Sequence, residues 1–122
     1  MRVSMSPKIL IVENERRLRQ FYKVELEAEG YEVRTAANGN DALVKLREAP
    51  VHVVIFDLAF SDEAELECLQ NLVNDNREAK VMIHAANPAF CMDFRTWAAD
   101  AFLMKSSDAA SLKGAVGRLL EA

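Results

Sequence analysis

The sequence has little of what marks several classes of protein. It contains two cysteines, Cys68 and Cys91, with no CxxC pair and no Cys/His cluster, so neither a disulfide framework nor a structural zinc site is expected. No apolar run approaches the roughly 20 residues of a membrane-spanning helix, and the first six residues carry no apolar stretch of a secretory signal. We therefore expect reduced thiols and a cytoplasmic location without membrane attachment.

The chain also has fewer basic than acidic residues, 15 against 19. The formal net charge is −4, and the only dense basic group, Arg16, Arg17 and Arg19, falls in a segment rich in glutamate. Phosphate backbones are bound by clustered Lys and Arg, so we expect no direct binding to nucleic acid. With only four glycines in the chain, no Gly-rich phosphate loop follows the first apolar run, which argues against a flavodoxin-like cofactor binder or small enzyme.

The composition is typical of a globular protein: of the 122 residues, 51% are hydrophobic and 28% are charged. This length suits one domain with one continuous core. We expect that domain over residues 7–122, preceded by a short extension of residues 1–6.

Short apolar runs alternate with amphipathic stretches along the sequence. The apolar and β-branched runs predict strands, and the stretches with apolar residues at helical spacing predict helices. The expected strands are 8–12, 31–36, 51–56, 80–85 and 101–104. The expected helices are 15–29, one capped by Asn40, 63–74, 90–99 and one capped by Asp108. In the first of them Leu18, Phe21, Tyr22 and Leu26 lie at helical spacing, which predicts that they form its apolar face.

A strand followed by a helix, repeated five times, predicts an α/β fold of the flavodoxin-like, doubly wound (βα)5 type. Right-handed crossovers place helices on both faces of a parallel sheet. The expected strand order is 2-1-3-4-5, and ligands of such sheets bind where the order reverses, beyond the carboxyl ends of the first and third strands.

Polar residues follow the strands at that place. Glu13 and Asn14 come after the first strand, Asp57 ends the third, and Lys105 follows the fifth. Two carboxylates and an amide oxygen are hard ligands suited to Mg²⁺, and a lysine can pair with a carboxylate or a phosphoryl group. The set therefore suggests phosphoryl chemistry with an aspartate nucleophile.

Five segments resemble the receiver domain of bacterial two-component response regulators, in order and over roughly residues 7–121. They read Ile9-Leu-Ile-Val-Glu-Asn-Glu15, Gly30-Tyr-Glu-Val33, Ala37-Asn-Gly-Asn-Asp-Ala-Leu43, Val53-Val-Ile-Phe-Asp-Leu58 and Ala98-Ala-Asp-Ala-Phe-Leu-Met-Lys105. The resemblance implies a phosphorelay protein that accepts a phosphoryl group with Mg²⁺ from a histidine kinase or phosphotransfer protein.

The resemblance also assigns roles to residues. It implies that Asp57 is the phosphoacceptor and that Lys105 contacts the phosphoryl group. The metal ligands that it implies are Glu13, Asn14, Asp57 and the backbone carbonyl of Ala59. The switch positions are Ala85 and Phe102. Pairing of two copies through the fourth helix, fifth strand and fifth helix is the implied homodimer, and any catalysis is limited to self-phosphorylation and dephosphorylation.

The sequence departs from the family pattern at the predicted site. Asn14 stands where an aspartate is usual, so Mg²⁺ binding is expected to be weak because one carboxylate charge is lost. Ala85 stands where a Ser or Thr hydroxyl is usual, and Ser106 where a proline is usual. A pseudo-receiver that binds partners without phosphorylation is therefore the alternative function.

Several residues also have a structural interpretation. Asp57 can end a strand and cap a turn, Asn14 can cap the first helix, and His84 fits a buried core histidine. Phe90, Phe94 and Trp97 fit either core packing or a partner surface.

Overall fold

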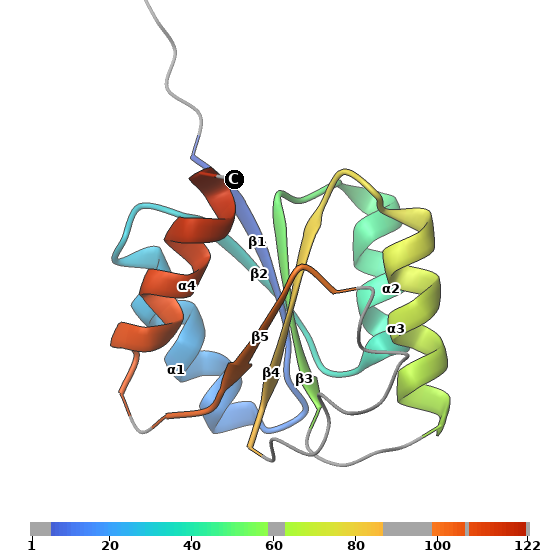
Figure 1. Cartoon of the computed structure of the whole chain (residues 1–122), viewed down its shortest axis with the longest axis horizontal. Helices are drawn as coiled ribbons and strands as arrows, with labels where there is room; N and C mark the ends of the chain where they lie inside the picture. Colours follow the sequence, from blue (N-terminus) through green and yellow to red (C-terminus); the bar gives the residue numbers. More distant parts are fainter. Residues whose placement is uncertain (1–5, 59–62, 87–98, 107, 122) are drawn as a thin grey trace, which may run out of the picture.

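The structure is a computed structural model that describes residues 6–58, 63–86, 99–106 and 108–121. One parallel sheet forms its centre, with strand order β2-β1-β3-β4-β5 (Figure 1). The strands are β1 (Lys8–Val12), β2 (Glu32–Ala36), β3 (Val53–Leu58), β4 (Lys80–Ala85) and β5 (Ala101–Met104). This order confirms the predicted flavodoxin-like fold.

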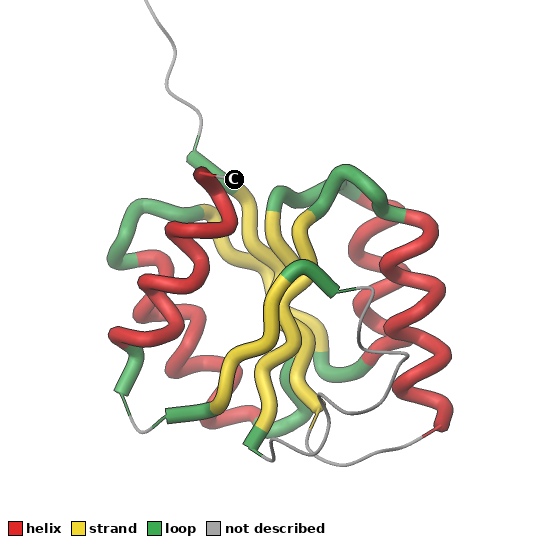
Figure 2. Tube along the Cα trace, in the orientation of Figure 1, coloured by secondary structure: helices red, strands yellow, loops and turns green. Residues whose placement is uncertain are grey.

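Helices cover both faces of the sheet. They are α1 (Arg16–Glu27), α2 (Gly39–Glu48), α3 (Glu63–Asp75) and α4 (Ala110–Glu121). Figure 2 shows α1 and α4 on one side of the sheet and α2 and α3 on the other. The helix expected over 90–99 lies, apart from Ala99, outside the described residues.

Each face of the sheet has its own apolar core, because neighbouring residues of a strand point to opposite faces. On β1, Leu10 and Val12 pack with α2 and α3, and Ile9 and Ile11 pack with α1 and α4. The three inner strands are buried on both faces. This burial explains why their sequences are continuous apolar runs, as parallel strands require.

Three local predictions are wrong in position. The cap of α2 is Asn38, whose side chain accepts a hydrogen bond from the Asp41 N–H at 2.9 Å, and Asn40 lies inside the helix. The third strand runs to Leu58, so Asp57 is part of its ladder. Phe21, expected on the buried side of α1, is 39% exposed.

The last helix begins as predicted. The Asp108 carboxylate accepts a hydrogen bond at 3.0 Å from the N–H of Ala110, its first residue. No described helix is long and apolar enough to cross a membrane.

Candidate functional site

Three charged residues converge at the carboxyl edge of the sheet. Glu13 follows the last residue of β1, Asp57 is the penultimate residue of β3, and Lys105 follows β5. The register places β1 against β3 and β3 against β4, with β5 on the far side of β4. The sheet therefore brings to one edge the residues that the sequence predicted there.

The Lys105 ammonium joins the two carboxylates. Its Nζ lies 2.6 Å from Oδ1 of Asp57 and 3.0 Å from Oε1 of Glu13. The side chains of Asp57 and Glu13 are only 5% and 2% exposed, and that of Lys105 is 16% exposed. The cost of removing these charges from water offsets much of their mutual attraction, so a buried cluster of this kind adds little net stability.

Glu13 is fixed by the chain around it. Its Oε2 accepts a hydrogen bond from the Glu15 N–H at 3.1 Å, and its carbonyl accepts one from Nη1 of Arg19 at 2.8 Å. Its own N–H donates to the Ala36 carbonyl at the end of β2. The carboxylate thus satisfies a backbone donor at the start of α1. Asn14, the expected cap, makes no such bond, because the capping position is Glu15.

Burial changes the acid–base behaviour of the site. Desolvation raises the pKa of Asp57 to about 6, against the lowering effect of Lys105 and with a further increase from Glu13. Burial disfavours the charge on Lys105, but its bonds to Asp57 and Glu13 outweigh this and raise its pKa. Asp57 is therefore mostly ionised at neutral pH, and Lys105 stays protonated.

The oxygens at this edge suit a hard cation. Oδ1 of Asp57 is buried and receives no directed hydrogen bond, although the ammonium of Lys105 pairs with it by charge. Asn14, which follows Glu13 in sequence, is exposed. Within the described part of the chain, no three His, Cys, Asp or Glu side chains gather around one point. This donor set fits Mg²⁺, which binds through one or two carboxylates and keeps several waters.

Two aromatic rings lie on the α1 side of the site. His84 stands opposite Asp57 in the β3–β4 ladder and is 3% exposed, so it is buried in the core as predicted. The ring of Tyr22 packs edge to face with it, at a centroid distance of 5.2 Å. Burial, then the positive charge of Lys105, lowers the pKa of His84 to about 4. The imidazole is therefore neutral at neutral pH.

Tyr22 was predicted only as an apolar core position. Burial is the main reason that its pKa is raised, and the charges of Lys105, Glu13 and Asp57 also act on it. Its helical spacing gave no signal of this proximity, which depends on how α1 packs on the sheet.

The structure describes some of the remaining residues that the sequence singled out, and others lie outside the described part of the chain. Ala85 is buried at the end of β4, and Phe102 on β5 is half-buried against the core shared with α2 and α3. Ser106 is exposed, and its hydroxyl accepts a hydrogen bond from the Asp108 N–H at 3.4 Å. Four predicted residues lie outside the described part of the chain, namely Ala59, Phe90, Phe94 and Trp97.

Both the sequence and the fold of this chain match known proteins. Residues 9–117 match the family model described as the response regulator receiver domain. Among curated proteins, the phosphate regulon transcriptional regulatory protein PhoB of Rhizobium meliloti is 35% identical over 68 residues, which are 56% of this chain and 30% of that protein. The transcriptional regulatory protein ResD of Bacillus subtilis is 30% identical over 78 residues, 64% of this chain and 32% of that protein. The matches thus span about a third of these relatives.

Solved structures match over nearly the whole chain. The response regulator protein TrrA of Thermotoga maritima, in complex with Mg²⁺-BeF, is 34% identical and has a TM-score of 0.85, covering 94% of this chain and 99% of that one. TrrA in complex with the histidine kinase ThkA has a TM-score of 0.83 at the same identity, covering 95% of this chain and 99% of that one.

Proposed function

This chain belongs to the receiver-domain family of response regulators, and we propose that it works in a phosphorelay by accepting a phosphoryl group on Asp57. The observation that carries the proposal is the contact between this buried carboxylate and the Lys105 ammonium, at 2.6 Å. A carboxylate nucleophile beside a fixed cation is the arrangement that phosphoryl transfer to aspartate needs.

The proposed reaction is a displacement at phosphorus. A carboxylate oxygen of Asp57 forms a bond to phosphorus while the bond to the donor's histidine nitrogen breaks, so the side chain becomes an acyl phosphate and the donor imidazole is released. The pKa of about 6 keeps Asp57 mainly ionised at pH 7 and therefore nucleophilic. Lys105 is placed to bind the added phosphoryl oxygens, which are stronger partners than a single carboxylate.

We propose that Glu13, Asp57, Asn14 and the carbonyl of Ala59 hold Mg²⁺. The ion would offset negative charge on the carboxylates and the incoming phosphoryl group. Because Asn14 contributes an amide where a carboxylate would add a negative charge, we expect weak binding. TrrA, 34% identical to this chain, was crystallised with Mg²⁺-BeF, which supports this proposal.

The proposed donor is a histidine kinase or a phosphotransfer protein in the cytoplasm. The complex of TrrA with the histidine kinase ThkA supports a kinase partner. We further propose that two copies pair through β5 and its flanking helices, one of which is α4, and that the chain itself makes no direct contact with nucleic acid, given its net charge of −4.

A pseudo-receiver remains the second candidate, and one observation favours it. Lys105 already binds both carboxylates, so a cation must compete with the ammonium for the same oxygens. Ala85 has no hydroxyl with which to bind a phosphoryl oxygen. In this alternative the closed Glu13–Lys105–Asp57 cluster is a permanent structural element, and the domain acts by binding partners alone.

Incubation with Mg²⁺ and acetyl phosphate, followed by intact-mass measurement, separates the two functions. A phosphoryl adduct of about 80 Da on the native chain, absent from Asp57→Asn, supports the phosphoacceptor. Asp75→Asn, which removes an exposed carboxylate from α3, is the matched control and should label like the native chain.

Two outcomes contradict the phosphoacceptor proposal. One is the absence of an adduct on a chain whose circular dichroism shows it to be folded, which favours the pseudo-receiver. The other is an adduct that persists in Asp57→Asn, which places the chemistry on another residue.

A further inference from the structure

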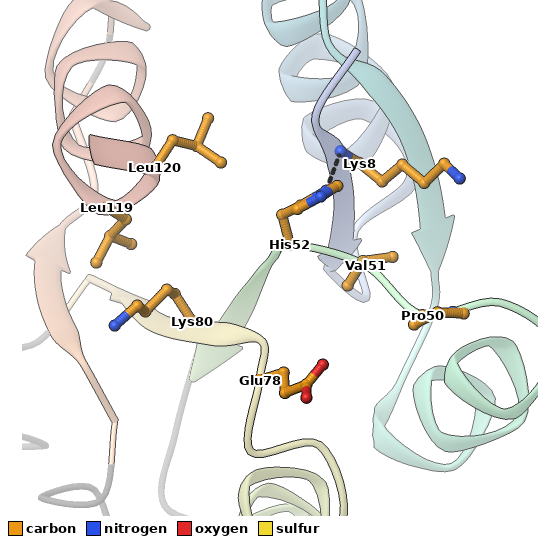
Figure 3. Close-up of a pocket in the computed structure, with 8 residues that line it drawn as sticks. All are labelled: Lys8, Pro50, Val51, His52, Glu78, Lys80, Leu119 and Leu120. Carbon is orange, nitrogen blue, oxygen red and sulfur yellow. Dashed lines mark hydrogen bonds between the residues drawn. The ribbon is translucent and has the colours of Figure 1, made fainter. Parts of the chain in front are cut away.

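The edge of the sheet opposite to Asp57 carries a cavity. This cavity, of about 460 Å³, opens among the starts of β1, β3 and β4 and the end of α4 (Figure 3). His52, on its wall, precedes β3 by one residue, and Asp57 lies five residues further on, which corresponds to roughly 17 Å along an extended chain. The two sites therefore do not share residues.

The polar wall of this cavity is held in place by the backbone. The Lys8 N–H donates to Nδ1 of His52 at 2.9 Å, and the His52 N–H donates to the Lys8 carbonyl at 2.8 Å. The Lys80 N–H donates to the His52 carbonyl at 2.9 Å. Because Nδ1 of the imidazole accepts a hydrogen bond, its Nε2 carries the proton and is left as a donor. This donor is thus fixed in orientation before any ligand arrives.

Three charged residues lie on the wall of the cavity. Two lysines, Lys8 and Lys80, and one acid, Glu78, line it. None of the three forms an ion pair with another described residue. Figure 3 shows the Lys80 side chain extended toward α4 and the Glu78 carboxylate on the opposite side. The Lys8 side chain points away from the other lining residues, so the charge on the α4 side of the cavity is the Lys80 ammonium.

The wall nearest Lys80 is apolar. Leu119 and Leu120, from the last turn of α4, are only partly buried and line the cavity, and Val51 lies across from them. A small-molecule site combines mainly apolar walls with a few fixed polar groups, in a volume of about 300 to 1,000 Å³. This cavity has both features and a volume in that range.

We propose that this cavity binds a small organic anion that carries a short apolar chain. The anionic group, a carboxylate or a phosphate ester, binds the Lys80 ammonium, and the apolar chain packs on Leu119 and Leu120. Such a ligand would join the last turn of α4 to the starts of three strands.

Hexanoate and hexyl phosphate are suitable probes, added to ¹⁵N-labelled full chain and followed by amide chemical shifts. We expect saturable changes in the amide chemical shifts of His52, Lys80 and Leu120, with little change at Asp57. Comparison of the two probes tells which anionic group is preferred. Hexan-1-ol and inorganic phosphate, each lacking one half of the ligand, should bind at least tenfold more weakly, because one charge-assisted hydrogen bond or one buried hexyl chain exceeds about 1.4 kcal/mol.

Lys80→Met keeps the length of the side chain and removes its charge, so it should weaken binding of both probes about tenfold. Lys23→Met, on the exposed surface of α1, is the matched control and should bind like the native chain. The proposal is overturned if neither probe shifts these amides, if hexan-1-ol or inorganic phosphate binds as well as the probes, or if Lys80→Met binds with native affinity.

Discussion

The ring of His84 packs edge to face against the ring of Tyr22, with centroids 5.2 Å apart, and burial there lowers the pKa of the imidazole to about 4. The unfolded chain therefore binds a proton on this residue at a pH where the folded chain does not. Above pH 6.5 His84 is neutral in both states and does not reduce the free energy of unfolding. As the pH falls from 6.5 toward 4, proton binding by the unfolded chain lowers the free energy of unfolding by up to about 3 kcal/mol.

His84→Leu removes that loss. Relative to the native chain, we expect the variant to gain stability steadily as the pH falls from 6.5 to 4. Urea unfolding at half-unit pH intervals measures the difference. A constant difference between the two proteins across this range would contradict the buried, neutral state of His84.

Asp57→Asn is expected to have the opposite pH dependence. The folded pKa of Asp57, about 6, lies above its ordinary value of 3.8, so the ionised carboxylate disfavours the fold. This penalty is full above about pH 6 and disappears as the pH falls to 3.8. The variant should therefore be more stable than the native chain at pH 7, by at most about 3 kcal/mol, and equal to it near pH 4.

The same urea series measures this variant, with Asp75→Asn as its control, since that carboxylate is exposed and should change the free energy of unfolding by no more than about 0.5 kcal/mol. A loss of stability in Asp57→Asn at pH 7 would show that its pairing with Lys105 outweighs the cost of burial.

Asn14→Asp restores a negative charge at the rim of the proposed magnesium site. Because the attraction of a dication grows with the charge of its ligands, we expect Mg²⁺ to bind about tenfold more tightly, as measured by isothermal titration calorimetry. Asn74→Asp, on the exposed last turn of α3 at the opposite edge of the sheet, adds the same charge away from the site and should leave the affinity unchanged. Equal affinities in Asn14→Asp and the native chain would remove Asn14 from the ligand set.

Gly39 limits how closely α2 can approach α3. A Cβ added there would lie 2.5 Å from Cβ of Cys68, whereas one added at Gly117 in α4 would meet no atom within 4 Å. Gly39→Ala should therefore lower the free energy of unfolding by about 1 to 3 kcal/mol, and Gly117→Ala should raise it by up to about 1 kcal/mol. Thermal unfolding of both variants tests this, and a Gly39→Ala chain as stable as Gly117→Ala would refute it.

The sequence predicted most of the fold because the inner strands are buried on both faces. The strand Lys80–Ala85 was predicted with its observed ends, since its apolar run starts after Lys80 and the loop signal Asn87-Pro88 follows in the sequence. Errors arose where two similar residues competed. Asn38 and Asn40 flank the same glycine, and only the backbone geometry decides which one caps α2.

The site was predictable in part for the same reason. Strand order brings Glu13 and Asp57 to one edge, and Lys105 was predicted at the same edge because it follows the fifth strand. The sequence could not reveal that the ammonium joins both carboxylates, because this depends on the path of the lysine side chain across β4. Nor could it reveal the cavity around His52, whose lining residues are scattered from Lys8 to Leu120.

The bond between Lys105 and Glu13 joins residues 92 positions apart, and this separation bears on the order of folding. Closing so long a stretch of chain costs entropy that is recovered only when β1, β3, β4 and β5 are already in register. The bridge therefore belongs to the last steps of assembly. A newly made or partly unfolded chain would hold Asp57 in water with an ordinary acidity, so the reactive environment of this carboxylate exists only in molecules whose entire sheet is complete.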